Sequence, residues 1–195
     1  MKPVKIGVLA LQGAITEHIR LLERLEAVEG CAVRYLDEIN TCDGLIIPGG
    51  ESTAIGRLLR DFHLLEPLRE KILSGFPVWG TCAGMILLAK RIENDSAVHL
   101  GVMDVTVCRN AYGRQMDSFQ TAVRVPEVSD GEIPLVFIRA PYVTQCSPEV
   151  KVLLRVQEHI VACRQESMLA TSFHPELTGN LSFHQYFTDM VRSSV

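Results

Sequence analysis

The chain has 195 residues, of which 47% are apolar and 22% are charged, and its formal net charge is −4. This length predicts one domain with a continuous apolar core that needs no disulfide or metal staple. The composition is ordinary for a globular protein. A weakly acidic balance argues against a nucleic-acid-binding protein, which normally carries a basic patch or stripe.

Six cysteines are scattered along the sequence, and no two of them have the CxxC spacing of a zinc or redox site. They are Cys31, Cys42, Cys82, Cys108, Cys146 and Cys163. The first residues lack the layout of a secretory signal peptide, and no apolar run approaches the roughly 18 residues that a membrane span requires. We therefore expect a cytoplasmic protein with reduced thiols, no membrane segment and no metal site.

The first half of the sequence alternates apolar, strand-like segments with amphipathic, helix-like ones. Strands are expected over residues 4–11, 32–36, 44–47 and 77–79, and helices over 14–27, 52–62, 64–74 and 83–92. The first of these helices places Ile15, Ile19 and Leu22 on one face, which is the spacing of a helix that packs on a sheet. Apolar strands that alternate with such helices predict a parallel sheet covered on both faces.

The second half is rich in strand-like segments with few helices between them. Strands are expected over residues 102–108, 119–125, 135–138, 150–156, 159–164 and 168–173, followed by a helix over 181–192. Hairpins or a mixed sheet edge account for this change. We therefore predict a single α/β domain over residues 1–195, with an open, mixed but mainly parallel sheet flanked by helices. Ligands of such sheets bind beyond the carboxyl ends of the strands, so the segments after residues 11, 47, 79 and 173 are the places to seek a site.

One of these segments, GTCAG at residues 80–84, joins a buried strand to a helix. Its G-x-C-x-G spacing is the thiol version of the nucleophile elbow G-x-S-x-G. A sharp strand-to-helix turn strains the central residue, and side chains two residues to either side would collide. The helix N-terminus also favours a thiolate. A free cysteine is more often a small buried apolar residue, but this context predicts that Cys82 is a nucleophile.

A thiol nucleophile needs a base, and the base needs an orienting group. His174 follows the strand expected over residues 168–173, where it can reach the elbow, and Glu176 comes two residues later. We predict that His174 is the base and that the Glu176 carboxylate holds its second ring nitrogen. His18, near the apolar face of the first helix, is expected to pack or to contact a partner. Four other histidines are expected at the surface, namely His63, His99, His159 and His184.

Two glycines, Gly49 and Gly50, follow another buried strand in the run PGGES at residues 48–52. Such a turn exposes backbone N–H groups and lets a ligand come close, as an oxyanion hole requires. A Gly-Gly pair is more often only a turn. This pair, however, falls at the same end of the predicted sheet as Cys82, which favours a part in the site.

In these features the chain resembles the triad class, or class I, of glutamine amidotransferases, whose flavodoxin-like domains carry a glycine-rich oxyanion strand, a G-x-C-x-G elbow and a His-x-Glu pair. Within that class it is similar over nearly its whole length to the glutaminase subunits of pyridoxal 5′-phosphate synthase. The matching runs are LQGA at 11–14, PGGEST at 48–53, GTCAG at 80–84, RNAYGRQ at 109–115, DSF at 117–119, FIRAP at 137–141 and SFHPELT at 172–178. The departures are Trp79, the pair at residues 179–180 and residues 26–30, expected to be a loop.

The resemblance implies hydrolysis of L-glutamine to L-glutamate and ammonia, without a cofactor or a metal. Cys82 would attack the side-chain carbonyl, with His174 as base and Glu176 orienting it. Backbone N–H groups of Gly50 and Ala83 would hold the oxyanion. The residues implied to bind the substrate are Gly50, Glu51, Ser52, Arg109, Ile138 and Arg139. An arginine suits the substrate carboxylate because its planar fork can bind both oxygens.

The resemblance also implies a partner, because ammonia released into water would be protonated and lost. No acceptor domain exists in this chain. The implied acceptor is a separate synthase subunit, a (β/α)₈ barrel that receives ammonia through a channel and builds pyridoxal 5′-phosphate from a pentose phosphate and a triose phosphate. The two subunits would form a hetero-oligomer with many copies of each, and the isolated glutaminase would be nearly idle. Gln12, at the end of the first strand, is our candidate for sensing the partner.

Two other functions fit part of the pattern. A cysteine peptidase or another thiol hydrolase would share the elbow, and covalent labelling of Cys82 by a diazo-ketone glutamine mimic distinguishes amidotransfer from both. A scaffold or regulator that kept only the fold is the second alternative. The intact set Cys82, His174 and Glu176 argues against it, and full biological function of a Cys82→Ala variant would favour it.

Overall fold

The computed structural model describes residues 3–109 and 118–194. The strands are β1 (Val4–Leu9), β2 (Val28–Val33), β3 (Gly44–Ile47), β4 (Val78–Thr81), β5 (Ala89–Ile92), β6 (Met103–Cys108), β7 (Ser118–Val125), β8 (Ser129–Ile138), β9 (Tyr142–Cys146), β10 (Lys151–Val156), β11 (His159–Gln165) and β12 (Met168–Thr171). The helices are α1 (Ile15–Leu22), α2 (Leu36–Asn40), α3 (Ser52–Asp61), α4 (Leu65–Leu73), α5 (Ala83–Leu88) and α6 (Ser182–Arg192), with a 3₁₀ turn η1 (Pro175–Leu177).

A mixed sheet forms the centre of the molecule, in the strand order β2-β1-β3-β4-β12-β11-β9-β6-β5, with β10 paired to β11. The strands from β2 to β12 in this order are parallel, and those that follow join through antiparallel pairs as far as β6. Strands β7 and β8 form a separate antiparallel hairpin. The predicted mixed sheet with a parallel core is therefore confirmed.

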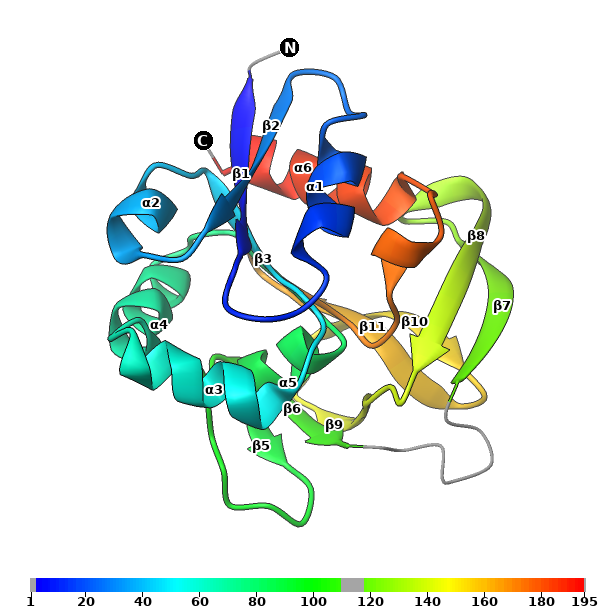
Figure 1. The fold of residues 1–195 in the computed structure, drawn as a ribbon. Helices are drawn as coiled ribbons and strands as arrows, with labels where there is room; N and C mark the ends of the chain where they lie inside the picture. The colour runs from blue at the N-terminus through cyan, green and yellow to red at the C-terminus, as the bar shows by residue number, and fades with distance from the viewer. Residues whose placement is uncertain (1–2, 110–117, 195) are drawn as a thin grey trace.

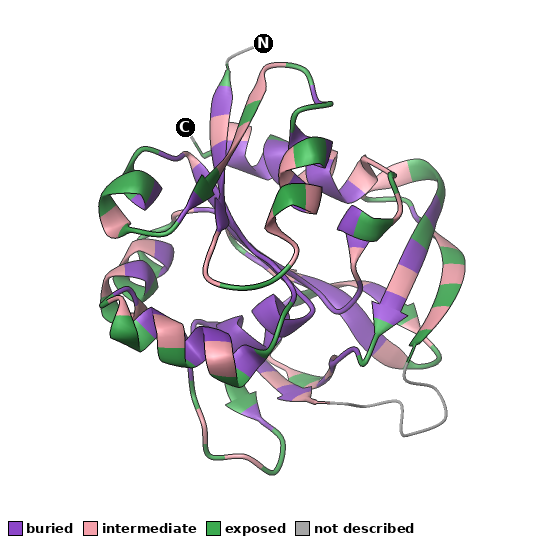
Figure 2. Cartoon of the chain, viewed as in Figure 1, coloured by how far each residue is buried: buried purple, intermediate pink, exposed green. Residues whose placement is uncertain are grey.

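Both faces of the central strands β3, β4 and β12 are buried, as their continuous apolar runs predict. Ile46, Trp79 and Leu169 lie side by side across β3, β4 and β12 and pack with residues of α1 and α6. Their neighbours Leu45 and Val78 point to the other face, where α3, α4 and α5 cover them. Figure 1 shows α1 and α6 on one side of the sheet and α3 and α4 on the other, and Figure 2 shows the buried strands between them.

The carboxyl ends of β1, β3, β4 and β12 meet at one edge, because these strands are parallel neighbours. The chain continues from these ends into Gln12, the Gly49-Gly50 pair, Cys82 and His174, respectively. The hairpin β7–β8 stands beside the same edge (Figure 1). A hydrogen bond of 2.8 Å from the backbone N–H of His174 to the carbonyl of Val136 joins the hairpin to this edge of the sheet.

The expectations for the first helix and the second strand are wrong at their bounds. Helix α1 ends at Leu22 rather than at residue 27, and β2 begins at Val28 rather than at residue 32. Ala27 has a positive φ of 55°, so a right-handed helix could not have continued to residue 27. Val28 then pairs with Val4 of β1. Pairing with β1 outweighs the helical pattern of the sequence here, so residues 28–30, expected in a loop, belong to a strand.

Other differences follow from short elements whose partners are distant in sequence. The helix expected over residues 83–92 ends at Leu88, and its last four residues form β5, in which Ala89 pairs with Met103. A short apolar run suits a helix or a strand equally well, and pairing decides between them. The sequence does not predict α2 or β9, whose five residues each are too few to show a period. Strand β8 also starts earlier than residue 135.

Candidate active site

Cys82 lies at the tip of the turn between β4 and α5, with φ of 47° and ψ of −104°. A positive φ is strained for a residue other than glycine. The flanking glycines permit close packing: a Cβ on Gly80 would lie 2.5 Å from the carbonyl carbon of Gly84, and a Cβ on Gly84 would lie 2.2 Å from the carbonyl oxygen of Ile47. The strain and the need for both glycines, predicted from the sequence, are confirmed.

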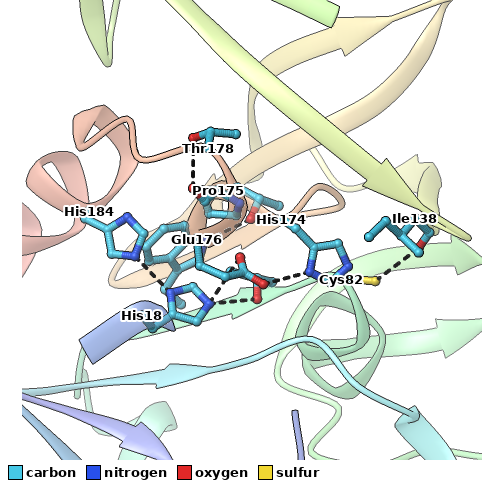
Figure 3. A network of polar contacts seen from close by, with 11 residues as sticks. His18, Cys82, Ile138, His174, Pro175, Glu176, Thr178 and His184 are labelled. Atoms are coloured by element: carbon cyan, nitrogen blue, oxygen red, sulfur yellow. Dashed lines mark hydrogen bonds and ion pairs between the residues drawn. The ribbon is translucent and has the colours of Figure 1, made fainter. Parts of the chain in front are cut away.

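His174 and Glu176 flank this thiol. Nδ1 of His174 lies 2.7 Å from Oε1 of Glu176, and the ring also interacts with Cys82, which raises its pKa. Figure 3 shows the three side chains in a row, with the imidazole between the carboxylate and the sulfur. The side chain of Glu176 has no exposed surface. The fold thus brings together the three residues that the sequence singled out.

The charge of His174 depends on this arrangement. Burial alone would lower its pKa, because it disfavours the charged imidazolium. The interactions with Cys82 and Glu176 outweigh burial and raise the pKa of His174 to about 10. Beside these two partners the imidazolium is therefore the favoured form of the ring at neutral pH.

The loops after β1 and β3 pack tightly against each other and against the histidine. A Cβ on Gly49 would lie 2.5 Å from Cε1 of His174. Gly13, with φ of 112°, lies so close that a Cβ on it would come within 1.8 Å of the Gly49 carbonyl oxygen. Oε1 of Gln12 accepts a hydrogen bond of 2.9 Å from the backbone N–H of Glu51. The side chain of Gln12 therefore fixes the backbone immediately after the glycine pair.

A cleft of about 680 Å³ opens over the elbow. Every predicted site residue lines it: Gln12, Gly50, Glu51, Ser52, Cys82, Ala83, Arg109, Ile138, Arg139, His174 and Glu176. The remainder of the run RNAYGRQ and Asp117 of the run DSF lie outside the described residues. The cleft therefore gathers residues from both halves of the chain around one thiol.

Two charged residues of the cleft, Glu51 and Arg109, already have partners in the protein. Glu51 caps α3, its carboxylate accepting hydrogen bonds of 3.0 and 2.6 Å from the N–H groups of Thr53 and Ala54. Burial would raise the pKa of this carboxyl, but these bonds and the nearby Arg109 lower it overall. Arg109 forms an ion pair with Asp95. Its guanidinium has five N–H donors, so a bound carboxylate could share it.

The end of β8 reaches the thiol from the other side. The carbonyl oxygen of Ile138 lies 3.9 Å from Sγ of Cys82. Arg139, the next residue, is exposed and has a positive φ of 43°. Non-glycine residues in this region often sit at functional sites. The hairpin thus contributes a carbonyl and a guanidinium to a site otherwise built on the main sheet.

Two histidines expected at the surface are buried, which corrects the prediction. His184 has no exposed surface and His99 is 6% exposed. His184 packs edge-on against Trp79, on the buried face of α6. His99 packs against Gly56 of α3. The expectation that His18 packs is confirmed, since it has no exposed surface and also contacts the Trp79 ring.

All six cysteines lie within the described residues, and none forms a disulfide. Among residues 3–109 and 118–194, no group of three or more His, Cys, Asp and Glu side chains is placed to hold a metal ion. No helix in this part of the chain is long and apolar enough to cross a membrane.

The sheet, its helices and the elbow have the α/β fold of the class I glutamine amidotransferases. A solved structure described as a crystal structure of glutamine amidotransferase matches with a TM-score of 0.90 and 41% identity, over 96% of this chain and 98% of that one. PurLQS from Thermotoga maritima shares the fold at a TM-score of 0.69 and 17% identity, over 99% of both chains. The family model for the SNO glutamine amidotransferase family matches residues 8–193. The chain belongs to the SNO glutamine amidotransferase family.

Two relatives match nearly the whole chain. The first, from Ruminiclostridium cellulolyticum, is 64% identical over 187 residues, covering 96% of this chain and 99% of the relative. The second, from Carboxydothermus hydrogenoformans, is 55% identical over 188 residues, covering 96% of this chain and 98% of the relative. Both are named pyridoxal 5′-phosphate synthase subunit PdxT. The resemblance predicted from short motifs is therefore confirmed.

Proposed function

We propose that this chain is a cytoplasmic glutaminase domain that hydrolyses the side-chain amide of L-glutamine to L-glutamate and ammonia. The observation that carries the proposal is the alignment of Cys82, His174 and Glu176 at the cleft. Nδ1 of the histidine is 2.7 Å from the carboxylate, and Cys82 lies close enough to the ring to raise its pKa. Membership of a glutamine amidotransferase family supports glutamine as the substrate.

The reaction proceeds through a thioester. The Cys82 thiolate attacks the amide carbon, and the carbonyl electrons move to oxygen. The His174 imidazolium gives its proton to the amide nitrogen, the C–N bond breaks, and ammonia leaves. His174 then removes a proton from water, whose oxygen attacks the thioester, and glutamate departs as the Cys82 thiolate re-forms. Glu176 keeps the ring oriented and stabilises its positive charge in both halves of the reaction.

The oxyanion is held by the backbone N–H groups of Gly50 and Ala83. Ala83 is the first residue of α5, and the first N–H groups of a helix have no partner within it. Gly50 lies in the loop that Gln12 fixes by its bond to the next residue, Glu51. Loss of one such donor typically costs about 100- to 1,000-fold in rate.

The amino-acid head group of glutamine binds to charged and polar groups at the mouth of the cleft. Arg109 and Arg139 are suited to the α-carboxylate, because a guanidinium can bind both of its oxygens. Glu51 is suited to the α-ammonium group, since its carboxylate lies on the cleft and is held ionised. Gly50, Ser52 and Ile138 complete the binding surface.

The ammonia passes to a separate pyridoxal 5′-phosphate synthase subunit, with which this chain forms a hetero-oligomer. The names of the relatives from R. cellulolyticum and C. hydrogenoformans support this partner. The purpose of the pairing is chemical, because ammonia in bulk water is protonated and loses its nucleophilicity. Neither nucleic acid nor a membrane takes part.

The decisive experiment measures ammonia release from glutamine, with and without a pyridoxal 5′-phosphate synthase subunit. The wild type should release ammonia and should be stimulated by the synthase. Cys82→Ala should abolish release in both conditions, whereas Cys146→Ala, a control thiol that does not line the cleft, should behave like the wild type. Release by Cys82→Ala would refute the thiol mechanism, and an unstimulated wild type would refute the partner.

Gln12 senses the partner through its bond to the loop after β3. Gln12→Ala removes the acceptor of the Glu51 N–H, so the loop loses its fixed geometry while the core is untouched. We expect normal thermal unfolding and a turnover that the synthase no longer stimulates. Full stimulated turnover in Gln12→Ala would rule out this role.

A further inference from the structure

The second oxygen of Glu176 needs a partner of its own. Oε1 accepts a hydrogen bond from Nδ1 of His174, but Oε2 is buried and no well-aligned hydrogen bond reaches it among the described residues. Nε2 of His18 lies 3.4 Å from Oε2. A buried carboxylate oxygen without a donor is costly, because it has lost its bonds to water. His18 is therefore placed where this carboxylate requires a donor.

A second histidine, His184, contacts the other ring nitrogen of His18. Nδ1 of His18 lies 2.9 Å from Nε2 of His184. Both side chains are fully buried, one on α1 and the other on α6, and both pack edge-on against the Trp79 ring, with ring centroids 5.7 and 5.0 Å away. Figure 3 shows His184, His18 and Glu176 in sequence, leading to His174 and the sulfur.

The contacts of the two rings determine which nitrogen of His18 and of His184 carries the proton. Nδ1 of His184 has no hydrogen-bond partner among the described residues. A proton there would be a buried N–H without an acceptor, so a neutral His184 carries its proton on Nε2 and donates it to Nδ1 of His18. The proton of a neutral His18 is then on Nε2, which faces Glu176. The hydroxyl of Thr81, 3.5 Å from the same nitrogen, is a second partner.

Both rings are neutral in this environment. Burial, together with His184 and His174, holds the pKa of His18 well below its usual value, and burial lowers that of His184 to about 3. Neutrality matters for Glu176. A cation beside Oε2 would cancel the carboxylate charge and weaken its effect on His174, whereas a neutral N–H satisfies Oε2 and leaves the charge available.

We infer that His18, held in one tautomer by His184, is a positioning residue that donates to Oε2 of Glu176 and keeps Oε1 directed at His174. The row His184–His18–Glu176–His174 thus extends the site from the thiol to the opposite helix layer. Its effect on turnover rests on the proposed glutaminase function. Its effect on the reactivity of Cys82 does not.

The proton positions can be measured directly on the wild-type chain by ¹⁵N NMR of labelled histidines at neutral pH. We expect neutral rings with the proton on Nε2 in both His18 and His184. A proton on Nδ1 of His18, or a charged His18, would overturn the inference. This measurement needs no variant and no partner.

The consequence is tested with His18→Gln, whose amide N–H can replace Nε2–H, and His18→Leu, which has no donor. The reaction of Cys82 with iodoacetamide is followed by mass spectrometry of its peptide, and glutamine turnover is followed with the synthase present. His18→Leu should slow both by about 10- to 100-fold, as expected for one lost hydrogen bond to a charged group, with KM little changed. His18→Gln should stay within about threefold of the wild type.

Thr188→Val is the matched control, because Thr188 is equally buried on α6 and its hydroxyl donates a hydrogen bond to the His184 carbonyl. It should retain wild-type rates. If His18→Leu reacts like the wild type, or if His18→Gln is as slow as His18→Leu, the positioning role is wrong. If the wild type releases no ammonia, the glutaminase proposal fails, and the alkylation rates and the NMR still decide the role of His18.

Discussion

The charge of His174 is set by the two side chains on either side of its ring. The carboxylate of Glu176 and the thiol of Cys82 together outweigh the cost of burial. The same interaction that prepares the ring for proton transfer must therefore appear in the pH dependence of folding.

The free energy of unfolding should fall as the pH rises from 6.5 to 10. Over this range the folded chain keeps a proton on His174 that the unfolded chain has lost, because the pKa is raised from 6.5 to about 10. The stabilisation is complete below pH 6.5 and is gone above the folded pKa. Urea denaturation should show that the free energy of unfolding falls less with rising pH for His174→Asn than for the wild type. His63→Asn, at an exposed position, is the control, and equal slopes in all three proteins would contradict the assignment.

At the scale of elements, the elbow depends on a contact between two backbones. Helix α5 starts so close to β3 that Gly84 meets the carbonyl oxygen of Ile47. A backbone atom cannot move aside as a flexible side chain can. The close approach of α5 to β3 places the sulfur at the edge of the sheet. The stability of the elbow and the geometry of the site therefore depend on the same contact.

Gly84→Ala should therefore lower the free energy of unfolding by about 1–3 kcal/mol, the usual cost of overpacking. The higher helix propensity of alanine does not offset a contact of 2.2 Å. Gly131→Ala in β8 is the control, since the nearest atom to its Cβ is 3.8 Å away, and it should change the stability by less than about 1 kcal/mol. Chemical denaturation measures both. Equal stability of the two variants would show that α5 can shift.

The sequence predicts those elements whose pattern is local. The buried run of β3 and the strand–turn–helix around Cys82 are complete within a few residues, and His174 with Glu176 is a short motif beside a strand. By contrast, the bounds of β2 and the strand form of β5 depend on pairing with β1 and β6, outside the local pattern. His18 and His184 are 166 residues apart, and nothing local in either helix indicates that their rings meet behind the carboxylate.

At the scale of the whole molecule, the mouth of the cleft is partly apolar. Ile138 and Leu177 line it and are 38% and 47% exposed. Large apolar side chains grouped at a site often mark a contact with another protein. Under the proposed function, the synthase would cover this rim, and ammonia would leave the cleft without meeting bulk water.

Leu177→Asp should reduce the stimulation of glutaminase turnover by the synthase about tenfold or more, because a charge would replace an apolar anchor at the interface. The measurement is the ratio of turnover with and without the synthase. Leu73→Asp on α4 is matched in chemistry and is 60% exposed, but it does not line the cleft, so it should keep the wild-type ratio. Equal ratios for both variants would place the docking surface elsewhere.

The bond between the His174 backbone and Val136 has a mechanical consequence. His174, the proposed base, follows β12 of the central sheet and is hydrogen-bonded through its backbone to the β7–β8 hairpin. Loosening the hairpin would therefore be expected to disturb the position of the imidazole. Deuterium exchange at the His174 amide would record each opening of this hydrogen bond.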